Sequence, residues 1–89
     1  MVSSLLKVIS KNEYQLMSRL LRKKRKEKGI TQEVLASKLG VKQSDISKIE
    51  RLERRIDLIE TIAICHALEV DPAAFVKELE LANAPGNIK

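Results

Sequence analysis

Residues 31–51 read TQEVLASKLGVKQSDISKIER, and this stretch decides how the rest of the chain is arranged. Apolar residues recur at helical spacing both before and after the pair Gly40 and Val41, which a continuous helix would not favour. The hydroxyl of Thr31 can cap the first helix, and Gly40 can take the positive φ that ends it. Val41 is then expected to fill the space under the corner. The stretch therefore predicts two helices joined by a turn of about three or four residues.

The same stretch and its flanks carry residues that recur together at fixed spacing. They are TQ at 31–32, LA at 35–36, LGV at 39–41, QS at 43–44, SKIE at 47–50 and ERRID at 53–57. Together they resemble the phage-repressor-like (Xre/Cro-type) helix-turn-helix family over roughly residues 16–76. The resemblance implies an all-α, compact five-helix lambda-repressor-like DNA-binding domain, with the helix-turn-helix at helices two and three. One residue departs from the family pattern: Leu52 stands where the family usually has Gly.

The composition suits one small helical domain. The chain has 89 residues, with one Tyr, one Phe, three Gly and two Pro, which leaves little for hairpins. It has no apolar run of about 18 residues that could span a membrane, and its start lacks the pattern of a secretory signal. A single Cys65 cannot form an internal disulfide. We therefore expect a cytoplasmic protein that makes no contact with a membrane.

Positive charge is concentrated in the first two thirds of the chain. Residues 1–56 contain 15 Lys or Arg and 6 Asp or Glu, whereas residues 57–89 contain 2 and 6. The net charge of +5 therefore hides a basic half that includes the helix-turn-helix. This asymmetry is expected when one face of a protein meets a polyanion.

The helix before residue 31 is expected to be capped by Asn12 and to run to about residue 28. Arg25 lies one turn after Leu21, so it stays on the inward side of this helix. In the family that the chain resembles, the Arg matching Arg25 pairs with the Glu matching Glu50. The resemblance therefore implies a structural ion pair between Arg25 and Glu50.

The outer side of the helix that begins near residue 43 is expected to read DNA. Ile46 and Ile49 should point inward, which leaves polar side chains outside. Gln can pair with adenine, Lys with guanine and Ser with either base. Asp45 can either accept from a cytosine or cap the helix, and we favour the cap. The predicted base-contacting residues are Gln43, Ser44, Ser47 and Lys48, of which the family matches Gln43, Ser44 and Lys48.

Other polar residues are expected on the DNA backbone. Gln32 begins a helix, whose partial positive charge suits a phosphate, and the matching Gln of the family braces the recognition helix. Basic residues flank the turn and the loop after residue 50. The predicted backbone-contacting residues are Gln32, Lys42, Arg51, Arg54 and Arg55.

Leu52 leaves three alternatives open, because a non-Gly residue in the left-handed region costs roughly 1 kcal/mol. We therefore favour a recognition helix that extends by a turn into Glu53 and Arg54, or a loop that takes another path. Leu52 can also contact a second subunit.

The two last helices are expected at about residues 58–68 and after Pro72. Asp57 and Glu60 resemble a capping box, and Asp71 can cap the last helix. Five residues of the helix at 58–68 are predicted to lie in the core: Leu58, Ile59, Ile62, Ala63 and Leu68.

Apolar residues beyond the needs of this core are the candidates for a dimer surface: Leu5, Leu6, Leu79 and Leu81. Residues 1–12 are expected to form an arm or a short helix, residues 13–82 the DNA-binding domain, and residues 83–89 a flexible tail. Residues 5–9 can pack on the last helix, pack on a second subunit or stay free.

No set of residues points to an enzyme. Cys65 and His66 are adjacent on a helix and do not face each other, so they form neither a catalytic pair nor a metal site. We expect no metal and no cofactor. The expected function is a sequence-specific double-stranded DNA-binding regulator, most simply a repressor that acts as a homodimer on a palindromic operator. The alternative is an antitoxin or coregulator adaptor that uses the same fold to bind a protein partner.

Overall fold

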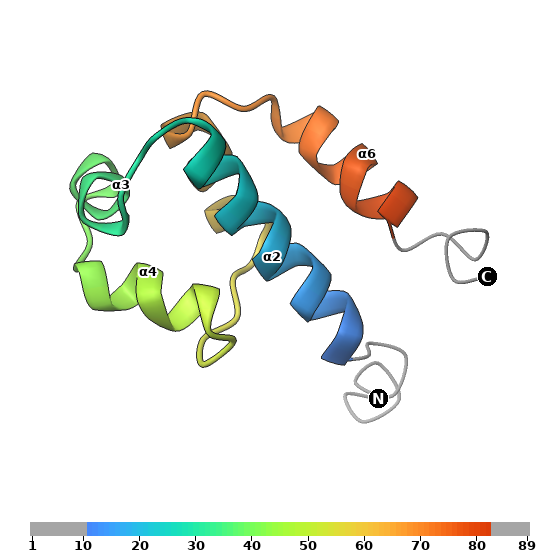
Figure 1. The fold of residues 1–89 in the computed structure, drawn as a ribbon, viewed down its shortest axis with the longest axis horizontal. Helices are drawn as coiled ribbons and strands as arrows, with labels where there is room; N and C mark the ends of the chain where they lie inside the picture. The colour runs from blue at the N-terminus through green and yellow to red at the C-terminus, as the bar shows by residue number, and fades with distance from the viewer. Residues whose placement is uncertain (1–10, 83–89) are drawn as a thin grey trace.

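The computed structural model describes residues 11–82, which form five helices and no strand. The helices are α2 (Lys11–Glu27), α3 (Gln32–Leu39), α4 (Gln43–Glu50), α5 (Leu58–Ala67) and α6 (Pro72–Ala82). Helix α2 lies between α4 on one side and α6 on the other (Figure 1). The expected all-α fold with a helix-turn-helix, here α3 and α4, is therefore present. None of the described helices is long and apolar enough to cross a membrane.

The ends of α3 follow the local chemistry of the sequence. The Thr31 hydroxyl accepts a hydrogen bond from the Val34 N–H at 3.1 Å, which caps the start of α3. Gly40 has φ +71°, and the next residue, Val41, donates its N–H to the Ala36 carbonyl at 3.0 Å. This pattern is a Schellman motif, which ends a helix by turning the chain through a left-handed residue. The predicted bend at Gly40 is confirmed.

The starts of α5 and α6 also confirm their predicted caps. The Asp57 carboxylate accepts from the Glu60 N–H at 2.7 Å, and Glu60 accepts from the Asp57 N–H at 2.9 Å. This reciprocal pair is a capping box. At α6, the Asp71 carboxylate accepts from the Ala73 N–H at 3.1 Å, with Pro72 as the first helical residue.

One hydrophobic core joins all five helices. Ala36 is buried on α3, which packs against both α4 and α5. Phe75 is almost fully buried and anchors α6 to the core. Burial raises the pKa of the Cys65 thiol, so this residue belongs to the packing of the core. The buried apolar residues are Leu21, Leu35, Ala36, Ile46, Ile49, Ile64, Cys65, Leu68 and Phe75.

The predicted core face of α5 is wrong in part. Leu58 is 65% exposed and Ile59 is 72% exposed, and Ala63 also lies at the surface. The helix is rotated so that a different set of residues, spaced three and four apart, faces inward. These inward residues are Thr61, Ile64, Cys65 and Leu68. The Thr61 hydroxyl donates to the Asp57 carbonyl at 2.8 Å, which satisfies the polar member of the set.

Two smaller expectations near α2 and the turn also need correction. Helix α2 begins at Lys11 and ends at Glu27, so Asn12 lies inside the helix and does not precede it. Val41 is 44% exposed, so it covers the corner only partly. The expected arm or helix over residues 1–10, with Leu5 and Leu6, and the expected tail at 83–89 lie outside the described residues.

Leu52 does not extend the recognition helix, which ends at Glu50. It takes a left-handed conformation with φ +64°, the conformation that the usual Gly of the family would favour. The Leu52 N–H donates to the Ile49 carbonyl at 3.2 Å, and the Glu53 N–H donates to the Lys48 carbonyl at 2.8 Å. These two bonds are a second Schellman motif. The favoured expectation of a longer helix was wrong because the hydrogen bonds of this turn outweigh the strain of about 1 kcal/mol at one residue.

The glycine that ends α3 in the left-handed conformation, Gly40, makes a measurable contribution to stability. We expect Gly40→Ala to lower the free energy of unfolding by about 1–2 kcal/mol, because a Cβ there meets no neighbour and the cost is the conformation alone. Glu69, which ends α5 at φ +58°, offers the reverse change, and we expect Glu69→Gly to leave stability unchanged or raise it. Urea unfolding followed by circular dichroism measures both variants. A Gly40→Ala protein as stable as the wild type would contradict the assignment of Gly40 to a left-handed helix end.

Candidate nucleic-acid interface

The four predicted base-contacting residues lie on the outer side of α4. Gln43, Ser44 and Lys48 are exposed, and Ser47 is half-buried. The opposite side of the helix carries Ile46 and Ile49, which are buried in the core. Helix α4 is thus held by its apolar side while its polar side remains accessible to a groove of DNA.

Asp45 caps α4. Its carboxylate accepts a hydrogen bond from the Lys42 N–H at 3.1 Å, before the first residue of the helix. The structure therefore favours the capping role over a contact with cytosine. Lys42 follows the bend with an exposed side chain, which leaves it available for the predicted backbone contact.

A buried ion pair joins α2 to the end of α4. The Arg25 Nε donates to Glu50 Oε2 at 2.6 Å, and Arg25 Nη2 donates to Glu50 Oε1 at 3.0 Å. The two side chains are only 9% and 6% exposed. Arg25 Nη1 also donates to the Ile30 carbonyl at 2.8 Å, in the connection between α2 and α3. The ion pair that the resemblance implied is therefore present, and it is bidentate.

The end of α4 has a further partner that sequence reasoning missed. Ser18 is buried, and its hydroxyl donates to the Glu50 carbonyl at 2.8 Å and to the Ile49 carbonyl at 3.2 Å. The sequence could have predicted this contact, because Ser18 lies two turns before Arg25 on the inward side of α2. A small polar residue at such a position satisfies carbonyl groups at a buried helix end.

A chain of hydrogen bonds connects the buried ion pair to the exposed surface of α4. Gln32 Nε2 donates to Glu50 Oε1 at 2.9 Å, and Gln43 Nε2 donates to Gln32 Oε1 at 2.7 Å. A carboxylate can only accept, so Glu50 fixes which end of the Gln32 amide faces it. Gln32 must then offer its oxygen to Gln43. The amide of Gln43 is thereby oriented, with its oxygen and one N–H free.

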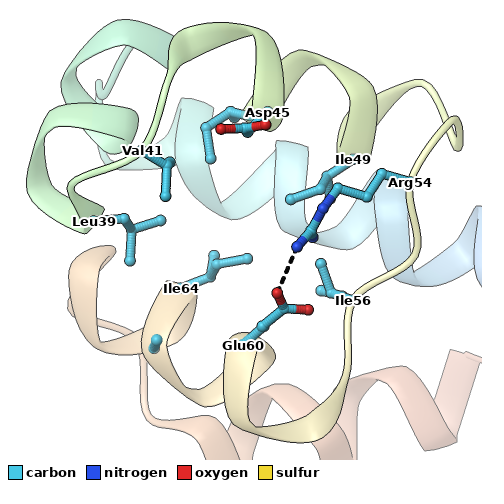
Figure 2. Close-up of a pocket in the computed structure, with 10 residues that line it drawn as sticks. Leu39, Val41, Asp45, Ile49, Arg54, Ile56, Glu60 and Ile64 are labelled. Atoms are coloured by element: carbon cyan, nitrogen blue, oxygen red, sulfur yellow. Dashed lines mark hydrogen bonds and ion pairs between the residues drawn. The ribbon is translucent and has the colours of Figure 1, made fainter.

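The three arginines after α4 each have a partner within the chain. Arg51 contacts Glu53 at 3.1 Å. Arg54 contacts Glu60 at 2.6 Å, as Figure 2 shows. Arg55 lies over the ring of Tyr14, 4.4 Å from its centroid, which is a cation–π contact. The bond from Arg54 lowers the pKa of the Glu60 carboxyl. The ion pairs are exposed to water and therefore weak, so a phosphate can replace their carboxylates.

A hollow of about 250 Å³ lies between the α3–α4 turn and α5. Figure 2 shows apolar side chains such as Leu39 and Ile64 within it, and the Arg54–Glu60 pair at its edge. The pair links the loop after α4 to the first turn of α5 and so limits where the loop can lie. Among the described residues, no group of three or more His, Cys, Asp or Glu side chains is placed to hold a metal ion.

A capped helix, a left-handed bend and a second helix with an exposed polar side define a helix-turn-helix DNA-binding domain. A family model described as helix-turn-helix matches residues 21–75. The chain belongs to the Xre-type helix-turn-helix family.

Three solved structures have the same fold along most of their length. An XRE-family like protein from Pseudomonas syringae pv. tomato str. DC3000 is 40% identical, with a TM-score of 0.81 over 90% of this chain and 98% of its own. The wild-type restriction-modification controller protein C.Esp1396I is 34% identical, with a TM-score of 0.73 over 79% and 91%. The clp gene regulator ClgR from C. glutamicum is 26% identical, with a TM-score of 0.72 over 82% and 95%. No curated protein sequence matches the chain. The family and these structures identify a DNA-binding transcription regulator.

The buried ion pair gives a sharp test of how α2 and α4 are held together. We expect Arg25→Met to lower the free energy of unfolding by about 3–5 kcal/mol, because it leaves the Glu50 carboxylate buried without its cation. Arg51→Met is the matched control, since it removes an exposed pair worth about 0–1 kcal/mol. Equal losses in urea unfolding would show that the Arg25 pair does not hold the two helices.

Proposed function

We propose that this protein is a sequence-specific transcriptional repressor that binds double-stranded DNA as a homodimer on a palindromic operator. The observation that carries the proposal is the oriented amide of Gln43, linked through Gln32 to a buried carboxylate on an exposed recognition helix. A surface Gln with no role in recognition has no need of such a fixed orientation. The network is therefore better explained by a residue that reads a base.

The free atoms of Gln43 match one base better than the others. Its oxygen can accept from the N6 amino group of adenine, while its remaining N–H donates to adenine N7. Guanine offers two acceptors at this edge, which would require both N–H groups, and one of these is held by Gln32. Lys48 is exposed further along α4 and suits guanine. Ser44 and Ser47 can contact either base.

The DNA backbone would be held on both sides of this reading surface. The start of α3 with Gln32 would approach one strand, because a helix N-terminus favours a phosphate. Beyond α4, three arginines would exchange their weak intrachain partners for phosphates. The proposed backbone contacts are Gln32, Lys42, Arg51, Arg54 and Arg55.

The two classes of contact predict different mutant behaviour. We expect Lys48→Ala to relax the base preference at one position of the site, because it removes a contact to a base edge. Arg54→Ala should instead weaken binding to specific and random duplexes alike, with a smaller salt slope. Selection of duplexes from a random pool, followed by gel shifts, distinguishes them. If Lys48→Ala weakens both kinds of DNA equally, the reading role of Lys48 is wrong.

Two apolar surfaces among the described residues can serve the proposed homodimer. One is the α6 surface with Leu79 and Leu81, of which Leu81 is 57% exposed. The other is the start of α5, where Leu58 and Ile59 are exposed together directly after the loop that follows the recognition helix. The α6 surface is bordered by charge, because Glu13 and Glu80 line the same depression as Leu79, which is only partly exposed. We therefore propose that the start of α5 forms the larger part of the dimer contact.

Sedimentation velocity tests this assignment. We expect Ile59→Glu to convert a dimer into monomers at micromolar concentration, because it places a charge in an apolar contact. Leu81→Glu, a matched change on α6, should leave the dimer intact. If only Leu81→Glu dissociates the dimer, the dimer contact lies on α6. A wild-type protein that stays monomeric on its operator would favour the alternative of an adaptor that binds a protein partner through this surface.

A further inference from the structure

Helix α2 carries a row of exposed cations that the DNA contacts proposed above do not use. Their spacing of three and four residues places them on one side of the helix, which we call the basic flank. They line an open depression on the surface together with Glu27. The members of the basic flank are Arg19, Arg22, Lys23 and Lys26.

Within the part of the chain that the structure describes, the basic flank has no carboxylate at ion-pair distance. None of the ion pairs among residues 13–82 includes any of these four side chains, and the Glu27 carboxylate lies 3.8 Å from Lys24. The segments 1–10 and 83–89 contain no Asp or Glu. No acidic side chain outside the described residues is therefore available to pair with the flank.

The contacts of α2 show which neighbour borders the basic flank. Lys24 faces α6, where its ammonium lies 2.8 Å from Glu78. Ser18 and Arg25 face the end of α4. Because successive residues turn by about 100° around a helix, Arg22 and Lys26 follow Ser18 and Arg25 on the side away from Lys24. Arg22 and Lys26 thus border α4, whereas Lys23 lies nearer to α6. There, the hydrogen bond from Lys24 and the charge of Lys23 lower the pKa of the Glu78 carboxyl. This agrees with the position of α2 between the two helices (Figure 1).

We propose that the basic flank of α2 binds phosphates of duplex DNA adjacent to the bases that α4 reads. The domain would then cover more of the duplex than its recognition helix reaches. From Arg19 to Lys26 the helix rises by about 10 Å. That length corresponds to about three phosphates on one strand, which lie about 3.4 Å apart along the axis. The planar fork of Arg19 and Arg22 suits phosphate oxygens.

This inference rests on the proposed function, and a duplex-length series separates the two. The first duplex is the selected binding sequence trimmed to the read bases, and the second carries about six additional base pairs at each end. The test variant is Arg22→Gln/Lys26→Gln. The matched control is Lys38→Gln/Lys77→Gln, which removes two exposed charges from α3 and α6. Dissociation constants are measured by fluorescence anisotropy across a series of KCl concentrations.

On the extended duplex we expect the test variant to lose about 1.8 from the salt slope, since each phosphate contact contributes about 0.9. Its difference in affinity from the wild type should shrink about tenfold between 50 and 200 mM KCl. On the trimmed duplex the variant and the wild type should bind alike. The control should match the wild type on both duplexes.

Other outcomes overturn the inference. An equal loss in the control would show an effect of net charge alone, and an equal loss on the trimmed duplex would place the contact within the read bases. If the test variant binds the extended duplex like the wild type, the flank does not bind DNA, and an acidic protein becomes its expected partner. If the wild type binds neither duplex, the proposed function itself fails.

Discussion

The buried contact between Arg25 and Glu50 is the constraint on which the arrangement of the other elements depends. Removing two charges from water is costly, and their mutual attraction offsets this cost only with good geometry and further hydrogen bonds. Here the further bonds come from Gln32 and from the Ile30 carbonyl, so the pair joins the end of α4, the start of α3 and the preceding connection. An apolar pair of the same size would fill the same space, but it would not fix the orientation of α4 relative to α2. The ion pair therefore contributes orientation more than net stability.

The orientation of the helices also depends on where each helix ends and how abruptly the chain turns there. Four helices end at a left-handed residue, two with Gly29 and Gly40 and two with Leu52 and Glu69. Glycine makes such a turn without strain, whereas the other two residues are held there by hydrogen bonds to the preceding turn. Leu52 is the instructive case, because the turn survives the loss of the usual glycine. The backbone bonds that close α4 thus specify the path of the loop more strongly than the conformational preference of one side chain does.

The parts of the structure that could be predicted from sequence are those set by short-range chemistry. Thr31, Gly40 and Asp57 act on groups a few residues away, so these two caps and this bend were predicted correctly, whereas the Asn12 cap and the path at Leu52 were not. The rotation of α5 was not, because Ile59 and Ile64 are equally apolar and only the surrounding helices decide which one is covered. The partners of Arg54 and Arg55 were missed for a related reason. Surface contacts such as these depend on the path of a loop, and nothing in the local sequence specifies that path.

The charges of this domain therefore fall into two groups with different physical roles. The buried group around Glu50 is satisfied within the chain, and its members cannot exchange partners without exposing an uncompensated charge. The exposed group holds its carboxylate partners weakly or, on the basic flank of α2, forms no ion pair within the described residues. In the proposed complex a polyanion would replace the weak intrachain contacts of this surface, while the buried network would keep Gln43 oriented. In the proposed complex the arginines that would supply affinity share no hydrogen bond with Gln43, so affinity and selectivity could vary independently at those positions. Gln32 is the exception, because it bonds to Gln43 and is also a proposed phosphate contact.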